Sequence, residues 1–335
     1  MTFLDILKRA ADGVILSPRE MEAALAELFE QDVPDAQAGA FLTALRVRGE
    51  TTEELIAAIR FLKVRAKTIA SPEGAVDCCG TGGDGISTVN ISTAVAFVAA
   101  GAGVPIAKHG SRAVTSKSGS SEVLSALGVD LTETIATQEK RLADDGIAFL
   151  FAPNHHPALA KVAPLRKELG LRTLFNILGP MMNPAQAKRQ LLGVFDRQLT
   201  PRFAEVLRAE GSHHAWVVYG AGGMDELSLA GGNEVTELKD GVIRSFVVAP
   251  EDAGLKRQAN QELVGGTPED NAAALMRLLE GEPGAYRDVV LLNAAATLIV
   301  AGKTDSLRDG VSLAAQSIDT GAAKEKLRVL TEPKQ

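Results

Sequence analysis

The feature that most limits how this chain can fold is the segment VDCCGTGGDGISTVNIST, residues 76–93. A short apolar run leads into a glycine-rich turn, and small hydroxyl and amide side chains follow the turn. Short apolar runs recur at 104–108, 147–151 and 215–220, with helical segments between them. Strands that alternate with helices usually form a largely parallel sheet. The sequence therefore predicts an α/β domain with a mostly parallel central sheet flanked by helices.

Residues 1–70 lack this alternation and are predicted to be all-helical. The sequences Ser17-Pro18-Arg19-Glu20 and Thr51-Thr52-Glu53-Glu54 are capping boxes, and apolar residues at helical spacing follow each of them. Near the other end, Thr267 begins a further capped helix, and residues 289–302 are typical of a buried helix. A helical module with so small a core usually packs on a partner domain or subunit.

Charge and cysteine content narrow the classes of function. The 335-residue chain has a formal net charge of −7, so it has no overall basic field to attract nucleic acid or anionic membrane. The two cysteines, Cys78 and Cys79, are adjacent and cannot form a disulfide framework, which favours a reducing compartment. The N-terminal residues include Asp5 and lack a long apolar run, so we expect no signal peptide and a cytoplasmic location.

The glycine-rich turn at 80–85 formally matches G-x-G-x-x-G after a strand. A dinucleotide-binding site also needs an acidic residue about 20 positions later, but no Asp or Glu occurs between Asp84 and Glu122. Within the turn, Asp84 would repel a pyrophosphate held on the backbone amides. A Walker A loop is excluded because no Gly-Lys-Ser/Thr follows. By itself, the turn leaves a plain structural turn as an open alternative.

The residues after the turn favour an anion site. Residues 85–121 contain no acidic residue but include Lys108, Arg112 and Lys117, together with a run of serines and glycines. A solvated basic loop is the commoner role of such a segment. Lysine, arginine, hydroxyl and amide donors together suit several phosphate oxygens at once, and a helix predicted from Ser121 adds a further anion-binding end. The segment therefore predicts binding of a polyphosphate.

An acidic pair, Asp225-Glu226, lies in a glycine-rich loop directly after a predicted strand. Alone, such a pair is usually exposed to solvent. Beside a polyphosphate it has another use, because Mg²⁺ prefers one or two carboxylates with substrate phosphate and water. The five histidines show no spacing typical of zinc ligands. The pair is therefore predicted to bind Mg²⁺.

Six segments together resemble the anthranilate phosphoribosyltransferase family of tryptophan biosynthesis, in order and spacing, over essentially the whole chain. They are GTGGDG, NIST, KHGSRAVTSKSGS, RKELGLRTLFNILGPMMNPA, YGAGGMDELSL and LNAAATLIVAG. The resemblance implies a small all-helical N-terminal domain joined to a large α/β domain, the fold of pyrimidine nucleoside phosphorylases. The helical domain would span 1–70, be completed by about 166–185 and form a homodimer contact; the α/β domain would span 71–335.

The resemblance also implies a reaction. The family transfers the phosphoribosyl group of phosphoribosyl pyrophosphate (PRPP) to the amine of anthranilate. The products are N-(5-phosphoribosyl)anthranilate and pyrophosphate. The reaction depends on Mg²⁺ and is the second step of tryptophan synthesis from chorismate. The aromatic amine is already neutral at pH 7, so it needs no strong base. Lys108 is expected to stabilise the leaving pyrophosphate, and because charge stabilisation and positioning supply the catalysis, we expect no residue to act as a nucleophile. The expected partners are the two substrates and a second copy of the chain.

The family's site residues correspond to positions in this sequence. PRPP would be bound by Gly80, Gly83, Asp84, Thr88, Asn90, Ile91, Ser92, Thr93, Lys108, His109, Gly110, Ser111, Arg112, Ala113, Val114, Thr115, Ser116 and Ser120. Anthranilate would contact Gly80, Ser111 and Arg166, and Mg²⁺ would contact Ser92, Asp225 and Glu226. The family usually has asparagine where this chain has Ser111. Serine is shorter and has one oxygen instead of an amide, which bears on selectivity for the aromatic acid.

Two other functions remain as alternatives. A pyrimidine nucleoside phosphorylase would share the fold and a KHG-like segment, but would not need Asp225-Glu226 for Mg²⁺. A non-catalytic relative could bind nucleic acid through a basic groove, although the net charge and the presence of Arg166 count against it. Type I phosphoribosyltransferases have an acidic pair on a strand before a T-G-x-T loop, and nothing here matches that arrangement.

Overall fold

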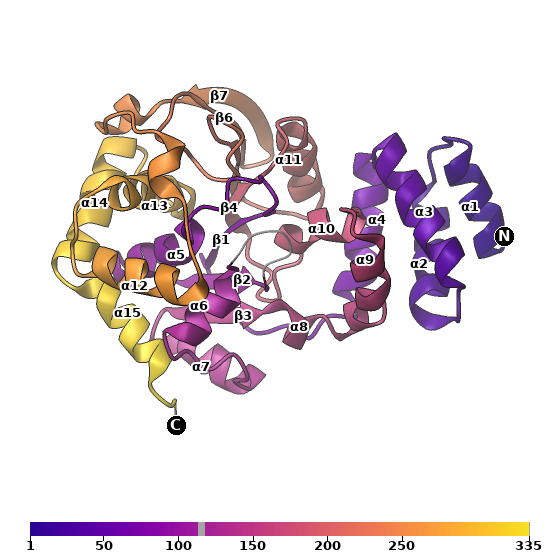
Figure 1. Cartoon of the computed structure of the whole chain (residues 1–335), viewed down its shortest axis with the longest axis horizontal. Helices are drawn as coiled ribbons and strands as arrows, with labels where there is room; N and C mark the ends of the chain where they lie inside the picture. Colours follow the sequence, from indigo (N-terminus) through magenta and orange to yellow (C-terminus); the bar gives the residue numbers. More distant parts are fainter. Residues whose placement is uncertain (113–117, 335) are drawn as a thin grey trace. The chain divides into compact units, whose positions relative to one another are not determined.

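The computed structural model describes residues 1–112 and 118–334, which form two compact units (Figure 1). The helical unit contains Met1–Lys67 and Pro153–Met182, and the α/β unit contains Thr68–Ala152 and the chain from Asn183 onward. The sequence places the completing segment of the helical part at about 166–185. In the structure, the segment that joins this unit begins earlier, at Pro153, and ends at Met182.

The helical unit is built around four N-terminal helices, each begun by a local sequence signal. Their bounds are α1 (Phe3–Ala11), α2 (Pro18–Glu30), α3 (Asp35–Arg48) and α4 (Thr52–Lys63). In the capping box of α2, the Glu20 N–H donates to Ser17 Oγ at 3.3 Å and the Ser17 N–H donates to Glu20 Oε2 at 2.8 Å. The predicted stripe of Met21, Leu25 and Leu28 is buried. Thr51 and Glu54 cap α4 in the same way.

The returning segment adds short helices to this unit. They are α8 (Ala152–His155), a 3₁₀ turn at Pro157–Ala160, α9 (Ala163–Leu169), α10 (Leu174–Leu178) and a second 3₁₀ turn at Gly179–Met181. Phe175 of α10 packs edge-on against Phe29 of α2 at a centroid distance of 5.6 Å. Arg46 of α3 donates to the carbonyl of Arg172 at 2.6 Å. These contacts join two stretches of chain that are more than 100 residues apart.

The α/β unit contains seven strands and eight α-helices among the residues that the structure describes. The strands are β1 (Val76–Gly80), β2 (Ile106–Gly110), β3 (Ile147–Phe151), β4 (Arg189–Gly193), β5 (His214–Tyr219), β6 (Asn233–Lys239) and β7 (Val242–Val248). The helices are α5 (Ile91–Gly101), α6 (Ser120–Ala126), α7 (Ile135–Asp144), α11 (Leu199–Ala209), α12 (Pro268–Leu279), α13 (Ala285–Ala301), α14 (Leu307–Asp319) and α15 (Ala322–Thr331). Short 3₁₀ turns lie at Pro250–Ala253 and Asn260–Leu263.

The strands form one sheet in the order β3-β2-β1-β4-β5-β6-β7. The first five strands in this order are parallel, and β6 and β7 are antiparallel additions at one edge. The predicted fold class, a small helical part plus an α/β part with a mostly parallel sheet, is confirmed. The apolar runs of the sequence correspond to β1, β2, β3 and β5. In the described part of the chain, no helix is both long and apolar enough to cross a bilayer.

The two faces of the sheet have cores of different size. Val76 and Cys78 of β1 face the larger core, to which α5 and α13 contribute many alanine and valine side chains. Figure 1 shows α5 and α13 beside the sheet. On the opposite face, Ala148 and Leu150 of β3 pack with Leu142 of α7 in a smaller cluster. Each large apolar side chain that is fully buried contributes about 1.5–3 kcal/mol to folding. The central strands are therefore held rigidly, which fixes the ends at which they stop.

Candidate active site

The strand order reverses direction between β1 and β4. From β1 the chain proceeds outward to β2 and β3, and then crosses to β4 and β5 on the other side of β1. In sheets of this kind, ligands bind beyond the carboxyl ends of the strands at such a switch point. Gly80 ends β1 and pairs with Gly193, which ends β4. The glycine-rich turn predicted from the sequence therefore begins at this switch point.

Asp225 lies directly against both of these strand ends. A Cβ atom added to Gly80 would be 2.3 Å from Asp225 Oδ2, and one added to Gly193 would be 1.6 Å from the carbonyl oxygen of Asp225. Only glycine allows so close an approach of the 219–231 loop. The Asp225 carboxylate accepts a hydrogen bond from the Gly82 N–H at 2.6 Å. Two segments that are 143 residues apart in the sequence are thus joined at one point.

The turn itself depends on glycine for its backbone conformation. Gly82, Gly83 and Gly85 all have positive φ, at 68°, 80° and 79°. Between them, Asp84 accepts from the Ile86 N–H through Oδ1 at 3.0 Å. Its charge also acts on Asp225 and raises the pKa of that carboxyl group. Asp84 therefore acts electrostatically on the acidic pair, and its predicted contact with PRPP stays a prediction.

Glu226 is buried and Asp225 is partly buried, contrary to the usual exposure of such loops. Burial raises the pKa of Asp225, and the charge of Asp84 raises it further. Burial likewise raises the pKa of Glu226, and the charge of Asp225 adds to the effect. Because two adjacent carboxylates with limited access to water repel each other, a cation placed beside them would lower their free energy. Raised pKa values that result from limited solvation and mutual repulsion are typical of a carboxylate pair that binds a metal ion.

Ser92 and Lys108 lie next to Glu226. The Ser92 N–H, in the first turn of α5, donates to Glu226 Oε1 at 3.1 Å. The Lys108 ammonium, on β2, is buried and donates to Ser92 Oγ at 3.2 Å and to the carbonyl of Cys78 at 2.8 Å. The charge of Lys108 lowers the pKa of Glu226, against the larger effect of burial. Three predicted residues from β2, α5 and the acidic loop therefore meet in one cluster.

These side chains offer the ligands that Mg²⁺ prefers. The carboxylates of Asp225 and Glu226 and the hydroxyl of Ser92 are hard oxygen donors, and the adjacent carboxylates need a positive charge. Within residues 1–112 and 118–334, no group of three or more His, Cys, Asp or Glu side chains is arranged to hold a metal alone. A site completed by substrate phosphate and water fits this donor set, whereas a closed protein cage does not.

The predicted loop from Lys108 onward is described only in part. His109 is buried, and its N–H donates to Asp77 Oδ1 at 3.1 Å. The Ser111 carbonyl accepts from Ser120 Oγ at 3.3 Å, which closes the base of the loop. The Arg112 guanidinium lies 5.9 Å from the centre of the Phe151 ring. The predicted ligands Ala113, Val114, Thr115 and Ser116 lie outside the described residues.

Residues 88–93, whose hydroxyl and amide side chains follow the turn, are held in place by the C-terminal part of the chain. Thr88 forms a β-bridge with Val264, and the carbonyl of Asn90 accepts from the Tyr286 hydroxyl at 3.1 Å. Ile91 and Thr93, in the first turn of α5, are buried. This segment therefore has little freedom to rearrange when a ligand binds, which favours a preformed anion site.

Arg166, the predicted anthranilate contact, lies on α9 of the helical unit. Its guanidinium is 5.9 Å from the centre of the Phe175 ring, and burial lowers its pKa. Burial lowers the pKa of an arginine by removing water from the cation, and an anion from a ligand would compensate for that loss. The side chain is therefore suited to binding a carboxylate.

Three side chains with little exposure to solvent support the site and were not anticipated from the sequence. Asp77 of β1 is fully buried and binds the His109 N–H; Tyr286 binds Asn90; and Asn293 of α13 binds both backbone groups of Leu227, next to Glu226. Asp77 and Asn293 give weak signals in a sequence, because each is a polar residue within an otherwise apolar strand or helix segment. The segment LNAAATLIVAG contains one of them, Asn293, at a position that is otherwise apolar.

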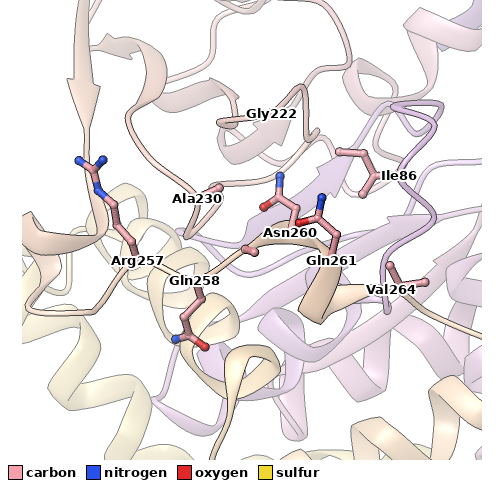
Figure 2. A pocket seen from close by; sticks show the side chains of 9 residues that line it. Ile86, Gly222, Ala230, Arg257, Gln258, Asn260, Gln261 and Val264 are labelled. Atoms are coloured by element: carbon pink, nitrogen blue, oxygen red, sulfur yellow. The ribbon is translucent and has the colours of Figure 1, made fainter.

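A pocket of about 680 Å³ lies beside the turn, and Figure 2 shows the side chains that line it. Its lining is Ile86, Gly222, Ala230, Arg257, Gln258, Ala259, Asn260, Gln261 and Val264. None of the predicted ligands of PRPP, anthranilate or Mg²⁺ is in this set. Asn260 accepts from Ser228 Oγ at 2.6 Å and donates to the Ala221 carbonyl at 2.9 Å. The pocket wall therefore braces the loop that contains the acidic pair.

Comparisons with known proteins agree with this arrangement. The family model described as "Glycosyl transferase family, a/b domain" matches residues 72–324, and the one described as "Glycosyl transferase family, helical bundle domain" matches residues 4–66. The fold and the site thus define a glycosyl transferase with a helical bundle and an α/β domain. Two curated relatives identify the family within this class.

The relative from Rhodopseudomonas palustris strain HaA2 is 51% identical over 98% of this chain and 97% of its own length. The relative from Parvibaculum lavamentivorans is 52% identical over 98% and 96%. Both are named anthranilate phosphoribosyltransferase. This chain belongs to the anthranilate phosphoribosyltransferase family, and the resemblance described from its sequence is confirmed.

Solved structures give the same result. The anthranilate phosphoribosyltransferase of Thermus thermophilus has a TM-score of 0.91 at 41% identity and covers 98% of each chain. The Saccharomyces cerevisiae enzyme, in complex with PRPP and Mg, has a TM-score of 0.90 at 29% identity and covers 98% of this chain and 96% of its own.

Proposed function

We propose that this enzyme transfers the phosphoribosyl group of PRPP to the amine of anthranilate. The products are N-(5-phosphoribosyl)anthranilate and pyrophosphate, and the reaction is the second step of tryptophan synthesis from chorismate. The observation that supports this most strongly is the contact between Gly82 and Asp225 at the switch point of the sheet. It places a donor-rich turn, suited to phosphate, against an acidic pair suited to a divalent cation. A sugar polyphosphate bound with Mg²⁺ requires both.

The residues after β1 and β2 bind PRPP in this proposal. The backbone amides of the glycine-rich turn and the side chains of Thr88, Asn90 and Thr93 supply hydrogen-bond donors to its oxygens. Residues from Lys108 to Ser116, with Ser120, cover the same ligand from the β2 side. Hydrogen-bond donors and cations in a partly buried cradle bind phosphate more strongly than the same groups in water.

Mg²⁺ is held by Asp225 and Glu226, with Ser92 as a further oxygen ligand. The yeast enzyme was solved in complex with PRPP and Mg, and the present chain has, at the switch point, an acidic pair in which both carboxyl groups have raised pKa values. When bound, the ion neutralises charge that develops on the departing pyrophosphate. Lys108 adds a second positive charge, because its ammonium group lies within hydrogen-bond distance of Ser92.

The chemistry needs no nucleophile from the protein. The anthranilate amine is neutral at pH 7, so the difficult step is departure of pyrophosphate from the anomeric carbon. Cys78 and Cys79, the strongest nucleophiles near the turn, are buried, and burial raises the pKa of both thiols. Arg166 binds the anthranilate carboxylate, and Ser111 and Gly80 contact the same substrate. The protein then acts by positioning the substrates and by charge stabilisation.

The helical unit also contributes to a homodimer in this proposal. Exposed apolar side chains occur on or beside its helices, among them Ile15, Val47 and Val64, which are 61%, 81% and 80% exposed. Apolar side chains that gather on one small unit favour association. Light scattering after gel filtration tests this point, and a monomer at micromolar concentration would contradict it. We also propose a cytoplasmic location, in keeping with the two unpaired cysteines.

One assay tests the proposed reaction directly. Anthranilate fluorescence should fall when the enzyme, PRPP and Mg²⁺ are mixed, and omission of any one component should abolish the change. The same preparation, given uridine or thymidine with inorganic phosphate, should release no base. Base release without anthranilate consumption would instead identify a nucleoside phosphorylase.

A further inference from the structure

Asn90 holds an unusual position at the start of α5. An asparagine that immediately precedes a helix usually caps it, because its side-chain oxygen accepts from a backbone N–H of the first turn. The Asn90 side chain makes no such bond to α5. Its Oδ1 instead accepts from Asn271 Nδ2 at 2.9 Å. The amide is therefore withdrawn from its usual role and held by a residue 181 positions later in the chain.

The hydrogen bond between Gly266 and Asn271 determines which atom of the Asn271 amide faces Asn90. Asn271, in the first turn of α12, is 2% exposed, and its Oδ1 accepts from the Gly266 N–H at 2.8 Å. A backbone N–H can only donate, so the atom of Asn271 that faces it must be the oxygen. The nitrogen of Asn271 must then face Asn90, and the atom of Asn90 that meets this nitrogen must be its oxygen. One backbone N–H thus sets the orientation of two side-chain amides in series.

The result is that the nitrogen of Asn90 points away from α12. Its Nδ2 lies 3.5 Å from the carbonyl of Ser118, at the base of the loop predicted to close over PRPP. An amide nitrogen has two N–H groups, so Nδ2 can also donate to a ligand oxygen. The oxygens of a phosphoribosyl pyrophosphate are mostly anionic acceptors, which attract N–H groups and repel a carbonyl oxygen.

We propose that Asn271 is a positioning residue for this reaction: it fixes the Asn90 amide so that Asn90 presents N–H groups to PRPP. The inference rests on the proposed function, in which Asn90 is a PRPP ligand. Asn271 does not itself touch the substrate in this account. It acts through the orientation of a neighbour, and a substitution at Asn271 should therefore change PRPP affinity only while Asn90 is present.

The variant Asn271→Asp tests the orientation. The new carboxylate would accept from the Gly266 N–H, as the asparagine does. It has no N–H group, however, so it could not donate to Asn90 Oδ1 and could only accept a hydrogen bond from the Asn90 amide. The Asn90 amide must then rotate, donate to the new carboxylate, and turn its oxygen toward PRPP. We expect the Kd for PRPP with Mg²⁺, measured by titration calorimetry, to rise about tenfold or more. The KM for anthranilate should stay within about twofold of its original value.

A double-mutant cycle separates the orientation effect from the added negative charge. Asn90→Ala should itself raise the Kd for PRPP. If Asn271 acts through Asn90, Asn271→Asp should have less than about a twofold further effect in the Asn90→Ala background. If the carboxylate simply repels the pyrophosphate, the full effect should persist there. That second result would overturn the proposal.

Two further variants guard against a purely structural explanation. Thr267→Ala removes the cap of the same helix, in which Asp270 N–H donates to Thr267 Oγ1 at 3.2 Å, without touching the amide pair. It should lower the melting temperature and leave the Kd for PRPP unchanged within about twofold. If Asn271→Asp does not fold, Asn271→Leu replaces it in the cycle, since leucine has a similar volume and removes both hydrogen bonds.

The outcomes distinguish this inference from the proposed function. An unchanged Kd for PRPP in Asn90→Ala would mean that Asn90 is not a PRPP ligand, so the site assignment and the inference would fail together. A raised Kd in Asn90→Ala with an unchanged Kd in folded Asn271→Asp would overturn the inference alone. A raised Kd in Thr267→Ala equal to that in Asn271→Asp would show that loosening of α12 explains the effect.

Discussion

Asn293 binds both backbone groups of Leu227: its Oδ1 accepts from the Leu227 N–H at 2.9 Å, and its Nδ2 donates to the Leu227 carbonyl at 2.8 Å. Both residues are fully buried. Because Leu227 directly follows Glu226, this contact ties the acidic loop to α13 in the centre of the larger core.

Replacement of Asn293 by leucine should therefore affect both stability and metal response. The variant leaves a buried N–H and a buried carbonyl without their partner, at a cost of about 1–3 kcal/mol each. We expect a lower melting temperature and a higher Mg²⁺ concentration for half-maximal turnover. Thr297→Val is the matched control, because Thr297 is buried on the same helix and its hydroxyl donates to the Asn293 carbonyl. An equal change in Mg²⁺ response in both variants would contradict the prediction.

Gly193→Ala should displace Asp225. The added Cβ would lie 1.6 Å from the carbonyl oxygen of Asp225, and this oxygen belongs to backbone that cannot rotate away. A displacement of about 1 Å at a catalytic group can lower turnover about 100-fold. Gly231→Ala provides the control, since its Cβ would make an ordinary contact at 3.6 Å. Steady-state kinetics on both variants tests the prediction, and similar kcat values would argue against it.

The double variant Asp225→Asn, Glu226→Gln should separate stability from activity. Neutral amides remove the repulsion between the two adjacent carboxylates, so we expect a higher melting temperature without Mg²⁺. Turnover should fall at least about 100-fold, and the increase in melting temperature on adding Mg²⁺ with PRPP should disappear. Thermal scans with and without ligands measure both effects. A retained Mg²⁺-dependent shift would remove the pair from the metal site.

Arg166→Ala should mainly weaken anthranilate binding. We expect the KM for anthranilate to rise about tenfold or more, because a guanidinium-carboxylate contact is a strong charge-assisted hydrogen bond. The Kd for PRPP should remain the same. Lys167→Ala, at the exposed neighbouring position, should leave both values unchanged. An equal loss of PRPP affinity in Arg166→Ala would show that Arg166 has another role.

The helical unit should lose stability as the pH falls below about 6.5. Burial lowers the pKa of His155, and it lowers the pKa of His156 to about 4. Below the unfolded-state pKa, the unfolded chain takes up protons that the folded chain does not, so stability present above about pH 6.5 is lost on acidification. For His156 the loss approaches about 3 kcal/mol near pH 4. Urea unfolding at about pH 7 and about pH 4.5 measures it.

His156→Gln should reduce this pH dependence, because glutamine has no proton to gain in that range. The quantity to compare is the change in the free energy of unfolding between the two pH values, so the two proteins need not be equally stable at neutral pH. An equal change in the variant and in the original chain would contradict the assignment of the pH dependence to His156.

Much of the fold follows from local sequence signals. The capping boxes at Ser17, Thr51 and Thr267 all begin helices, and the run at 147–151 is β3 with the same bounds. The hairpin of β6 and β7 was not predicted, although Asp240-Gly241 lies at its turn with φ values of 50° and 81°. Asp-Gly between two strands is a typical hairpin signal. These strands contain many charged residues, which weakened the apolar pattern on which strand prediction depends.

The candidate site likewise contains some residues that the sequence predicts and others that it does not. The glycine-rich turn and the acidic pair are predictable because each is a short, compositionally unusual segment. Asn271, Tyr286 and Asn293 are not predictable in this manner, since each acts on a residue 66 to 196 positions away. The packing of α13 against the sheet and of α12 against α6 brings them to the site. A sequence read along the chain contains no local signal for such contacts.

The burial of Cys78 and Cys79 in the central strand has a practical consequence. Burial raises the pKa of Cys78 to about 12 and holds that of Cys79 well above its usual value, so neither sulfur is a reactive thiolate in the folded chain. An alkylating reagent can therefore modify them only in molecules whose sheet has opened. Since these are the two cysteines of the chain, the mass added during a short pulse of reagent reports how often the centre of the enzyme unfolds, without any engineered label.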